Sequence, residues 1–191
     1  MTDADSSGKE HLRSRLLARR QRIPAVEREQ WSREISARLF NWDLYRKARR
    51  VHCFVGVESK GEVETLPVLE QMIQEGKEVY LPKVNASSPA LKHVRYRGPE
   101  SLVPGPYGIP EPTGEEAIAP EELDLILVPL LAADNRKNRL GYGMGYYDRF
   151  LARATGVSAG LLFQAFLLDK SLPAESHDIP LDYLITENGV V

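Results

Sequence analysis

Several features that mark other classes of protein are scarce in this sequence. Cys53 is the single cysteine among 191 residues, which excludes an internal disulfide. No apolar run reaches the length of a membrane span, and the polar first residues do not resemble a secretion signal. We therefore expect a cytoplasmic protein with no membrane partner. Cys53 lies in an apolar run, which predicts a buried thiol.

The chain also lacks an excess of positive charge. Its formal net charge is −2, whereas general nucleic-acid binders usually carry a basic surplus. We therefore expect no nucleic-acid partner, and any anionic ligand must be met by local basic residues. The four histidines are scattered without metal-ligand spacing. We expect His52 in a strand, and His11, His93 and His177 at the surface or in loops.

The two commonest phosphate-binding motifs are missing as well. No G-x-x-x-x-G-K-[ST] occurs, and G-x-G-x-x-G fails because Tyr146 stands at its last glycine. Residues 138–149, NRLGYGMGYYDR, instead place three glycines at alternate positions before a predicted helix. Such glycines admit positive φ and bring backbone N–H groups close to a ligand, and a helix start favours bound phosphate. A glycine-rich turn without a ligand is the alternative.

Charged residues flank this glycine loop, residues 141–145, on both sides. Arg139 precedes it and is a candidate phosphate clamp, and Asp148 follows it and is a candidate Mg²⁺ ligand. A plain turn needs neither group. The segment therefore indicates a site for a nucleotide or a phosphorylated intermediate.

An N-terminal helix is predicted ahead of the rest of the fold. Ser7-Gly8-Lys9-Glu10 has the form of a capping box, which predicts a helix from Ser7 to about Arg22. Leu12, Leu16 and Ile23 share one face of it at about 100° per residue. Three basic side chains follow the edge of that face and are placed to border the protein body: Lys9, Arg13 and Arg20. A solvated basic helix is the alternative.

Periodicity predicts the remaining elements. Pro24 ends the first helix or starts the next, whose apolar stripe (Trp31, Ile35, Leu39, Trp42) indicates core packing. A strand at 51–55, a helix at 65–75 ended by Gly76, and a strand at 78–82 form a βαβ unit with a parallel pair. Residues 85–121 hold one strand, 90–96, and a wall or cover at 104–112. The last elements are strands at 125–129, 159–163 and 183–186 and a helix at 146–154.

These elements predict a single α/β domain over residues 1–191. We expect three α/β/α layers around a mostly parallel, open central sheet, with an N-terminal helical segment. The apolar run 125–129 is typical of a central parallel strand. Ligands of open α/β sheets bind beyond the carboxyl ends of strands, and the glycine loop lies just downstream of this strand.

With these motifs in hand, the chain resembles the 5-formyltetrahydrofolate cyclo-ligase (5,10-methenyltetrahydrofolate synthetase) family. The resemblance runs from about Lys9 to Glu187. Its most specific part is R-L-G-x-G-x-G-Y-Y-D from Arg139 to Asp148. Shorter matches fall in the family's order: Lys9 with Arg13, Gly61-Glu62 within GEVET, Tyr107-Gly108-Ile109 and His177-Asp178.

The resemblance implies a ligase of one-carbon metabolism that uses ATP as co-substrate and Mg²⁺ as cofactor. The implied reaction converts 5-formyltetrahydrofolate to 5,10-methenyltetrahydrofolate and releases ADP and phosphate. The formyl oxygen takes the γ-phosphoryl group, and the folate N10 then attacks the activated carbon. The implied partners are these small molecules, and the implied state is a monomer or weak homodimer. A chain with no evident nucleophile triad suits this chemistry, because phosphoryl transfer depends mainly on positioning and charge neutralisation.

Residue roles follow from the matching positions. Arg139 and Tyr146 are implied as catalytic residues, and Asp148 and Asp178 as Mg²⁺ ligands. The implied ATP-binding residues are Lys9, Arg13, Arg139, Leu140, Gly141, Tyr142, Gly143, Met144, Gly145, Tyr146 and Tyr147. The implied folate-binding residues are Val55, Glu62, Tyr142, Gly143, Met144, Gly145 and Tyr146. Without the resemblance, Glu62 reads equally as an exposed loop carboxylate and Asp178 as a turn residue before Pro180.

Three positions depart from the family's usual pattern. Lys137 and Leu130 stand where glycine is common, and Ala133 stands where phenylalanine is common. Either the turn before Arg139 differs, or Lys137 adds a phosphate contact. Two other functions stay open beside the cyclo-ligase. One is an ATP-dependent enzyme acting on another formylated or amide substrate, and the other is a non-catalytic nucleotide- or folate-binding module.

Overall fold

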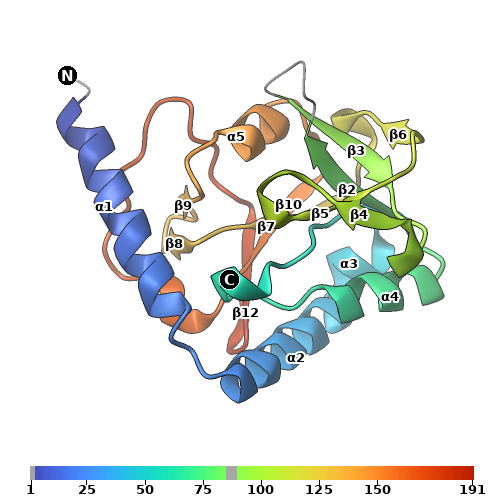
Figure 1. Ribbon diagram of the computed structural model, residues 1–191, viewed down its shortest axis with the longest axis horizontal. Helices are drawn as coiled ribbons and strands as arrows, with labels where there is room; N and C mark the ends of the chain where they lie inside the picture. Colours follow the sequence, from blue (N-terminus) through green and yellow to red (C-terminus); the bar gives the residue numbers. More distant parts are fainter. Residues whose placement is uncertain (1–2, 85–89) are drawn as a thin grey trace.

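An eight-stranded sheet forms the centre of the protein in a computed structural model that describes residues 3–84 and 90–191 (Figure 1). The strand order is β13-β12-β10-β7-β1-β2-β3-β6. The five strands from β12 to β2 are parallel, and antiparallel strands extend the sheet at both edges. The parallel strands are β1 (Arg50–His52), β2 (Glu78–Val84), β7 (Leu125–Pro129), β10 (Val157–Leu161) and β12 (Tyr183–Thr186). The edge strands are β3 (Leu91–Arg95), β6 (Ala117–Ile118) and β13 (Gly189–Val190).

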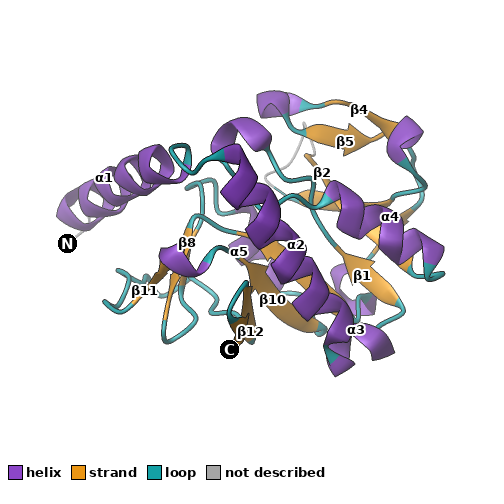
Figure 2. Ribbon diagram, turned by 90° about the horizontal axis from the view of Figure 1, so that it is seen from below, coloured by secondary structure: helices purple, strands orange, loops and turns teal. Residues whose placement is uncertain are grey.

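Helices cover both faces of this sheet, as the predicted three layers require. One face carries α2 (Ala25–Asn41), α3 (Asp43–Lys47) and α4 (Leu66–Gln74), and α2 lies across the sheet in Figure 2. The other face carries α5 (Tyr146–Leu151), drawn above the sheet in Figure 1. Helix α1 (Asp3–Arg20) stands to one side, beside the small strands β8 (Ala132–Asp134) and β9 (Arg139–Leu140) in Figure 1. Within residues 3–84 and 90–191, no helix is long and apolar enough to cross a bilayer.

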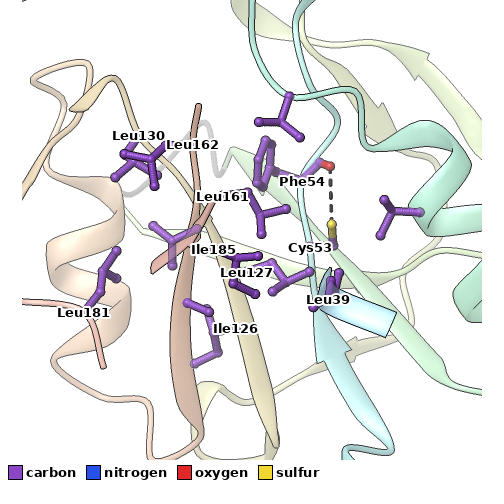
Figure 3. Close-up of a cluster of buried hydrophobic side chains, with 14 of the residues drawn as sticks. Leu39, Cys53, Phe54, Ile126, Leu127, Leu130, Leu161, Leu162, Leu181 and Ile185 are labelled. Carbon is purple, nitrogen blue, oxygen red and sulfur yellow. Dashed lines mark hydrogen bonds between the residues drawn. The ribbon is translucent and has the colours of Figure 1, made fainter. Parts of the chain in front are cut away.

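The core extends over both faces of the sheet, beneath α2 to α4 on one side and α5 on the other, and β7 runs through its middle. Leu125, Ile126 and Leu127 of β7 are each at most 1% exposed. Figure 3 shows Ile126 and Leu127 packed among side chains from neighbouring strands. Each fully buried side chain of this kind contributes about 1.5–3 kcal/mol. Cys53 belongs to the same cluster, as predicted, and burial raises the pKa of its thiol to about 12.

Most of the predicted elements are confirmed, including the parallel βαβ unit of β1, α4 and β2. The predicted capping box is wrong. Helix α1 begins at Asp3, so Ser7 lies within the helix and not at its start. A capping box is a local preference, and no proline upstream of Ser7 stops the helix from extending. Helix α5 also ends at Leu151 and not near Ala154.

A small hairpin separates β7 from the glycine loop, which the sequence analysis expected just downstream of that strand. It consists of β8 (Ala132–Asp134) and β9 (Arg139–Leu140), and β11 (Leu167–Leu168) pairs with β8. The Asp134 carboxylate is buried and accepts backbone N–H bonds from Arg136, Asn138 and Leu172. This carboxylate therefore fixes the turn that delivers Arg139 to the site.

The proline-rich stretch 85–121 holds more strands than the one predicted, and its residues 85–89 lie outside the described residues. In addition to β3 and β6, β4 (Leu102–Pro104) pairs antiparallel with β5 (Pro110–Pro112). The buried Glu111 of β5 accepts the backbone N–H of Val84 at 2.9 Å. That bond joins the β4–β5 hairpin to the end of β2. Single 3-10 turns lie at Glu58–Lys60, Pro99–Ser101, Pro106–Gly108, Pro120–Glu122 and Gln164–Phe166.

Candidate active site at the glycine loop

A cavity of about 590 Å³ lies between the glycine loop, α1, the loop that follows β1 and the β4–β5 hairpin. This volume is in the range of small-molecule sites. Every residue assigned a site role from the sequence lines it: Lys9, Arg13, Val55, Glu62, Arg139, Leu140, Gly141, Tyr142, Gly143, Met144, Gly145, Tyr146, Tyr147, Asp148 and Asp178. Segments far apart in the chain therefore meet around one space.

Two glycines of the loop adopt the left-handed backbone conformation that favours glycine. Gly143 has φ 92° and Gly145 has φ 63°. A Cβ on Gly143 would lie 3.3 Å from the guanidinium carbon of Arg13. Arg13 Nε also donates to the carbonyl of Gly141 at 3.0 Å. The missing side chain thus lets a basic residue of α1 lie against the loop.

The helix that follows the loop is shorter than predicted, and this shifts the source of positive charge. Helix α5 has six residues, and its dipole is correspondingly smaller than that of a long helix. Side chains supply the remaining charge at this end of the cavity. They are Lys9 and Arg13 from α1 and Arg139 from β9.

Arg139 is held between Asp148 and the backbone of Ile179. Its guanidinium is 4% exposed, forms an ion pair with Asp148 and donates to the carbonyl of Ile179. Burial lowers the pKa of Arg139, and the charge of Asp148 opposes that change. An arginine in this setting stays charged at neutral pH. The glycine loop therefore begins beside a fixed cation.

A second ion pair connects α1 to the last part of the chain. Lys9 Nζ lies 2.8 Å from Asp178 Oδ2 and 2.8 Å from Glu175 Oε1. Burial alone would lower the pKa of Lys9, but hydrogen bonds and charge from these carboxylates outweigh it and raise the pKa. Burial would raise the pKa of Asp178, but the bonds from Lys9 and the Glu175 backbone lower it. Both groups are therefore charged at neutral pH.

Glu62 marks the opposite end of the cavity and is buried, so the reading as an exposed loop carboxylate is wrong. Its side chain is 6% exposed. One carboxylate oxygen accepts the backbone N–H of Val57 at 2.8 Å, and the other accepts the phenol of Tyr142. A buried carboxylate aimed at a cavity suits a ligand that presents N–H groups.

The walls between these two ends are largely apolar or come from the loop itself. Val55 is 5% exposed behind Glu62, whereas Met144 and Tyr142 of the loop are 53% and 36% exposed. Leu140 is buried in β9, and Tyr146 opens α5. The opposite wall consists of Pro82, Val84, Leu91, Pro106, Ile109 and Pro110. The cavity thus has a charged end and an apolar middle.

Beneath α5 lies a pair of buried histidines, and this corrects the expectation that His93 is at the surface or in a loop. His93 belongs to β3 and is 2% exposed, and His52 of β1 is fully buried. Their Nδ1 atoms lie 3.4 Å apart, and His52 Nε2 lies 3.2 Å from the Tyr147 hydroxyl. Burial lowers the pKa of His52 strongly and that of His93 to about 4. Two neutral imidazoles therefore support Tyr147.

This histidine pair predicts a loss of stability in mild acid. In the unfolded chain His93 is protonated below about pH 6.5, whereas in the folded protein its pKa is about 4 and it stays neutral down to that pH. The contribution of neutral His93 to the free energy of unfolding is therefore fully present above pH 6.5. It falls by about 3 kcal/mol as the pH drops towards 4. Urea unfolding across this range should show the slope, and His93→Gln should reduce it to the part that His52 contributes. Equal slopes in both proteins, each normalised to pH 8, would contradict the assignment.

The three departures from the family's pattern lie outside the glycine loop, Arg139 and Asp148. Lys137 has φ 64°, a left-handed backbone conformation that glycine adopts more readily than lysine. Its Nζ donates to the carbonyl of Asp182 at 2.8 Å, and Lys137 is not among the described residues that line the cavity. The Lys137 ammonium group therefore does not face the cavity, and the phosphate contact considered for it is not observed. Leu130 and Ala133 are buried.

Some residues that line the cavity were not predicted as site residues from the sequence. Glu175 and His177 line the charged end, and Lys60 lies beside Tyr142 with its Nζ 4.5 Å from the ring centroid. Glu175 lies three residues before Asp178 in a polar segment, and this spacing is a usable signal. Lys60 precedes the Gly61-Glu62 motif directly. Arg20 shares the helix edge with Lys9 and Arg13, but the sequence alone indicates no role for it.

Comparison with known proteins extends these observations across the chain. Residues 5–187 match the model of the 5-formyltetrahydrofolate cyclo-ligase family. The chain is 33% identical to the 5-formyltetrahydrofolate cyclo-ligase of Mycolicibacterium smegmatis, with 96% of each chain covered. It is 30% identical to that of Escherichia coli K12, with 90% of this chain and 96% of the relative covered. The structure of 5,10-methenyltetrahydrofolate synthetase from Aquifex aeolicus matches with TM-score 0.83 and 34% identity, covering 95% of this chain and 91% of that one.

Proposed function

Because the chain belongs to the 5-formyltetrahydrofolate cyclo-ligase family, we propose that it uses ATP and Mg²⁺ to convert 5-formyltetrahydrofolate into 5,10-methenyltetrahydrofolate. ADP and phosphate are the other products. One observation carries the proposal. A single cavity is lined at one end by basic residues and the glycine loop, and at the other end by the buried Glu62. Two substrates bound at these ends meet over the loop.

The charged end is the place for the ATP phosphates. Lys9, Arg13 and Arg139 approach the glycine loop from α1 and β9. Backbone N–H groups of the loop and these cations match phosphate oxygens in charge and geometry. Lys9 and Arg139 are paired with carboxylates, so nucleotide binding exchanges one set of anionic partners for another.

The same end fits a Mg²⁺ ion. Asp148 and Asp178 line the cavity together, and the backbone N–H of Ile179, next to Asp178, donates to Asp148 at 3.3 Å. Within residues 3–84 and 90–191, no group of three metal-binding side chains occurs. Two carboxylates suffice for Mg²⁺, which usually completes its shell with water and substrate phosphates. Bound there, the ion would neutralise phosphate charge.

The Glu62 end is the place for the folate. The N–H groups of the pterin ring match a carboxylate acceptor, and Val55 provides an apolar contact beside it. The apolar wall from β2, β3 and the β4–β5 hairpin suits the remaining aromatic part of the substrate. The loop residues Tyr142 to Tyr146 lie between this end and the phosphates.

The reaction then needs two displacements in one place. The formyl oxygen bonds to the γ-phosphorus, and the oxygen that bridged the γ- and β-phosphates leaves with ADP. The N10 lone pair attacks the formyl carbon, N10 loses its proton, and the carbon–oxygen bond breaks as phosphate leaves. Arg139 neutralises the charge that develops on the transferred group, and Tyr146 contacts the reacting atoms from the start of α5.

The other two functions considered from the sequence gain no support from a specific observation. The change at Lys137 was the reason to consider a different formylated or amide substrate, and that side chain bonds Asp182 instead of lining the cavity. Retention of both Asp148 and Asp178 weighs against a module that merely binds its ligand. A cytoplasmic location and a monomeric or weakly dimeric state stay predictions.

An absorbance assay for the methenyl product tests the proposal. The protein is mixed with 5-formyltetrahydrofolate, ATP and Mg²⁺, and product should form with one ADP and one phosphate for each turnover. Omitting ATP, or chelating the metal, should stop the reaction. Folded protein that binds ATP yet makes no product under any metal condition would rule the proposal out.

A further inference from the structure

Arg20 occupies a buried position where three segments around the cavity meet. Its side chain is 5% exposed. Nε donates to the carbonyl of Lys60 at 2.8 Å, and Nη1 donates to the carbonyl of Leu130 at 2.9 Å. Nη2 donates to the phenol of Tyr142 and lies 3.7 Å from Glu62 Oε1. A single guanidinium thus joins the loop after β1, the end of β7 and the glycine loop.

The backbone around Arg20 is packed closely enough to hold this arrangement. Gly61 has φ 65°, and a Cβ there would come within 2.8 Å of the Arg20 carbonyl oxygen. Gln21 also donates to the carbonyl of Ser59 at 2.9 Å. The end of α1 is therefore in direct contact with the loop that carries Glu62, and movement of one displaces the other.

Glu62 depends on these neighbours for the direction of its carboxylate. One oxygen is fixed by the Val57 N–H at 2.8 Å, and the other by the Tyr142 phenol that Arg20 holds. Burial first, and then the charge of Glu62, raises the pKa of Tyr142. The phenol therefore keeps its proton and donates a hydrogen bond to Glu62. Arg20 is not among the described residues that line the cavity, so it reaches a substrate through these two side chains.

We infer that Arg20 is a positioning residue for the folate, which it orients through Glu62 and Tyr142. This inference rests on the proposed role of Glu62 at the folate end. The planar fork of arginine places three donors at fixed angles, and lysine has no equivalent geometry. Without Arg20, the Glu62 carboxylate and the Tyr142 phenol lose their common anchor, and the folate loses its aligned acceptor.

The position of Arg20 on α1 also relates the two ends of the cavity. Lys9, Arg13 and Arg20 lie on one side of the same helix, and the helix rises about 16 Å from the first to the last. Lys9 contacts Asp178 and Arg13 contacts Gly141 at the phosphate end, whereas Arg20 contacts the Glu62 end. One rigid element therefore sets the distance between the groups that hold the two substrates.

The test compares Arg20→Met with a matched buried arginine outside the cavity. Arg28 of α2 is 9% exposed and pairs with Glu58 at 3.1 Å and Glu64 at 3.4 Å. Arg20→Met should raise KM for 5-formyltetrahydrofolate by about tenfold to a hundredfold, with KM for ATP changed less than about twofold. Arg28→Met should lower the melting temperature and leave both KM values close to wild type. An equal rise in both KM values for Arg20→Met would overturn the inference.

A double-variant cycle separates positioning from a general loss of structure. Glu62→Gln alone should raise KM for the folate, and adding Arg20→Met to it should worsen KM by less than about threefold, because both changes act on one group. Fully multiplicative effects would show that Arg20 acts elsewhere. Should Arg20→Met not fold, Arg20→Lys tests the same point, since it keeps the charge and loses the fork; a wild-type folate KM in that variant would refute the idea.

The same experiments distinguish failure of this inference from failure of the proposed function. If the wild-type protein has no cyclo-ligase activity, the proposed function is wrong. Calorimetric titration with 5-formyltetrahydrofolate then measures directly how Arg20 affects the affinity for the folate. Binding weakened by Arg20→Met and not by Arg28→Met supports the role of Arg20 in that case. An active wild type whose Glu62→Gln variant keeps its folate KM overturns the inference and leaves the reaction in place.

Discussion

Replacing Arg139 by alanine should lower kcat by about a thousandfold or more, with the fold retained. Arginines that neutralise charge on a transferred phosphoryl group contribute about this much. Arg139 is 4% exposed, paired with Asp148, and fixed by the Ile179 carbonyl at the start of the glycine loop. Removing it leaves the γ-phosphate without its fixed cation and frees the Asp148 side chain. Steady-state kinetics with both substrates saturating, together with circular dichroism, measure the effect.

Two further variants make this result specific. Arg139→Lys keeps a positive charge without the fork, so its kcat should lie between those of the wild type and Arg139→Ala. Arg153→Ala removes an arginine that is 62% exposed and pairs with Glu121 outside the cavity. That control should retain wild-type kcat. An unchanged kcat in Arg139→Ala would remove the residue from the reaction.

Replacing Asp148 by asparagine should make the enzyme depend on far more Mg²⁺. The change keeps the shape of the side chain and removes its charge. Half-maximal activation should need at least about tenfold more Mg²⁺, because altering even the partners of metal ligands costs this much in affinity. A titration of activity against Mg²⁺, at fixed ATP, gives the constant directly.

The shape of that titration separates metal binding from loss of the Arg139 contact. Activity that recovers in part at high Mg²⁺ indicates a weakened metal site. Activity that stays low at every Mg²⁺ concentration indicates that Asp148 serves Arg139 alone, and it contradicts the metal assignment. Asp124→Asn is the control, because this carboxylate binds the backbone of Arg49 and Arg50 at the far end of β1.

Local patterns made the central fold predictable from the sequence. The run 125–129 is apolar throughout, and it forms β7 with those bounds. Gly76 ends α4 with φ 77°, as a glycine after a helix predicts. The β8–β9 hairpin was missed because its left-handed residue is Lys137, a residue type that seldom adopts positive φ. Prediction of turns from residue type was therefore wrong here, because the left-handed position holds an unusual residue.

The candidate site was predictable to the extent that its residues are neighbours in sequence. Arg139, the glycines and Asp148 lie within ten positions, and their types alone indicate phosphate chemistry. The pairing of His93 with His52 depends on strands β1 and β3 flanking β2, and no local pattern encodes that. The link from Lys9 to Asp178 spans 169 positions, and the family resemblance implied a site role for each residue but not the contact between them.

That last contact can form only after the C-terminal part of the chain has been synthesised. Helix α1 leaves the ribosome long before Asp178 has been translated, and until then Lys9 lacks the carboxylate partners it has in the folded protein. Contacts between distant parts of a chain form late, because a long loop must close first. The β-strands can pair earlier, but the phosphate end of the site is completed by the last fifth of the chain. A nascent chain stalled before residue 170 should therefore contain much of the sheet and show no turnover.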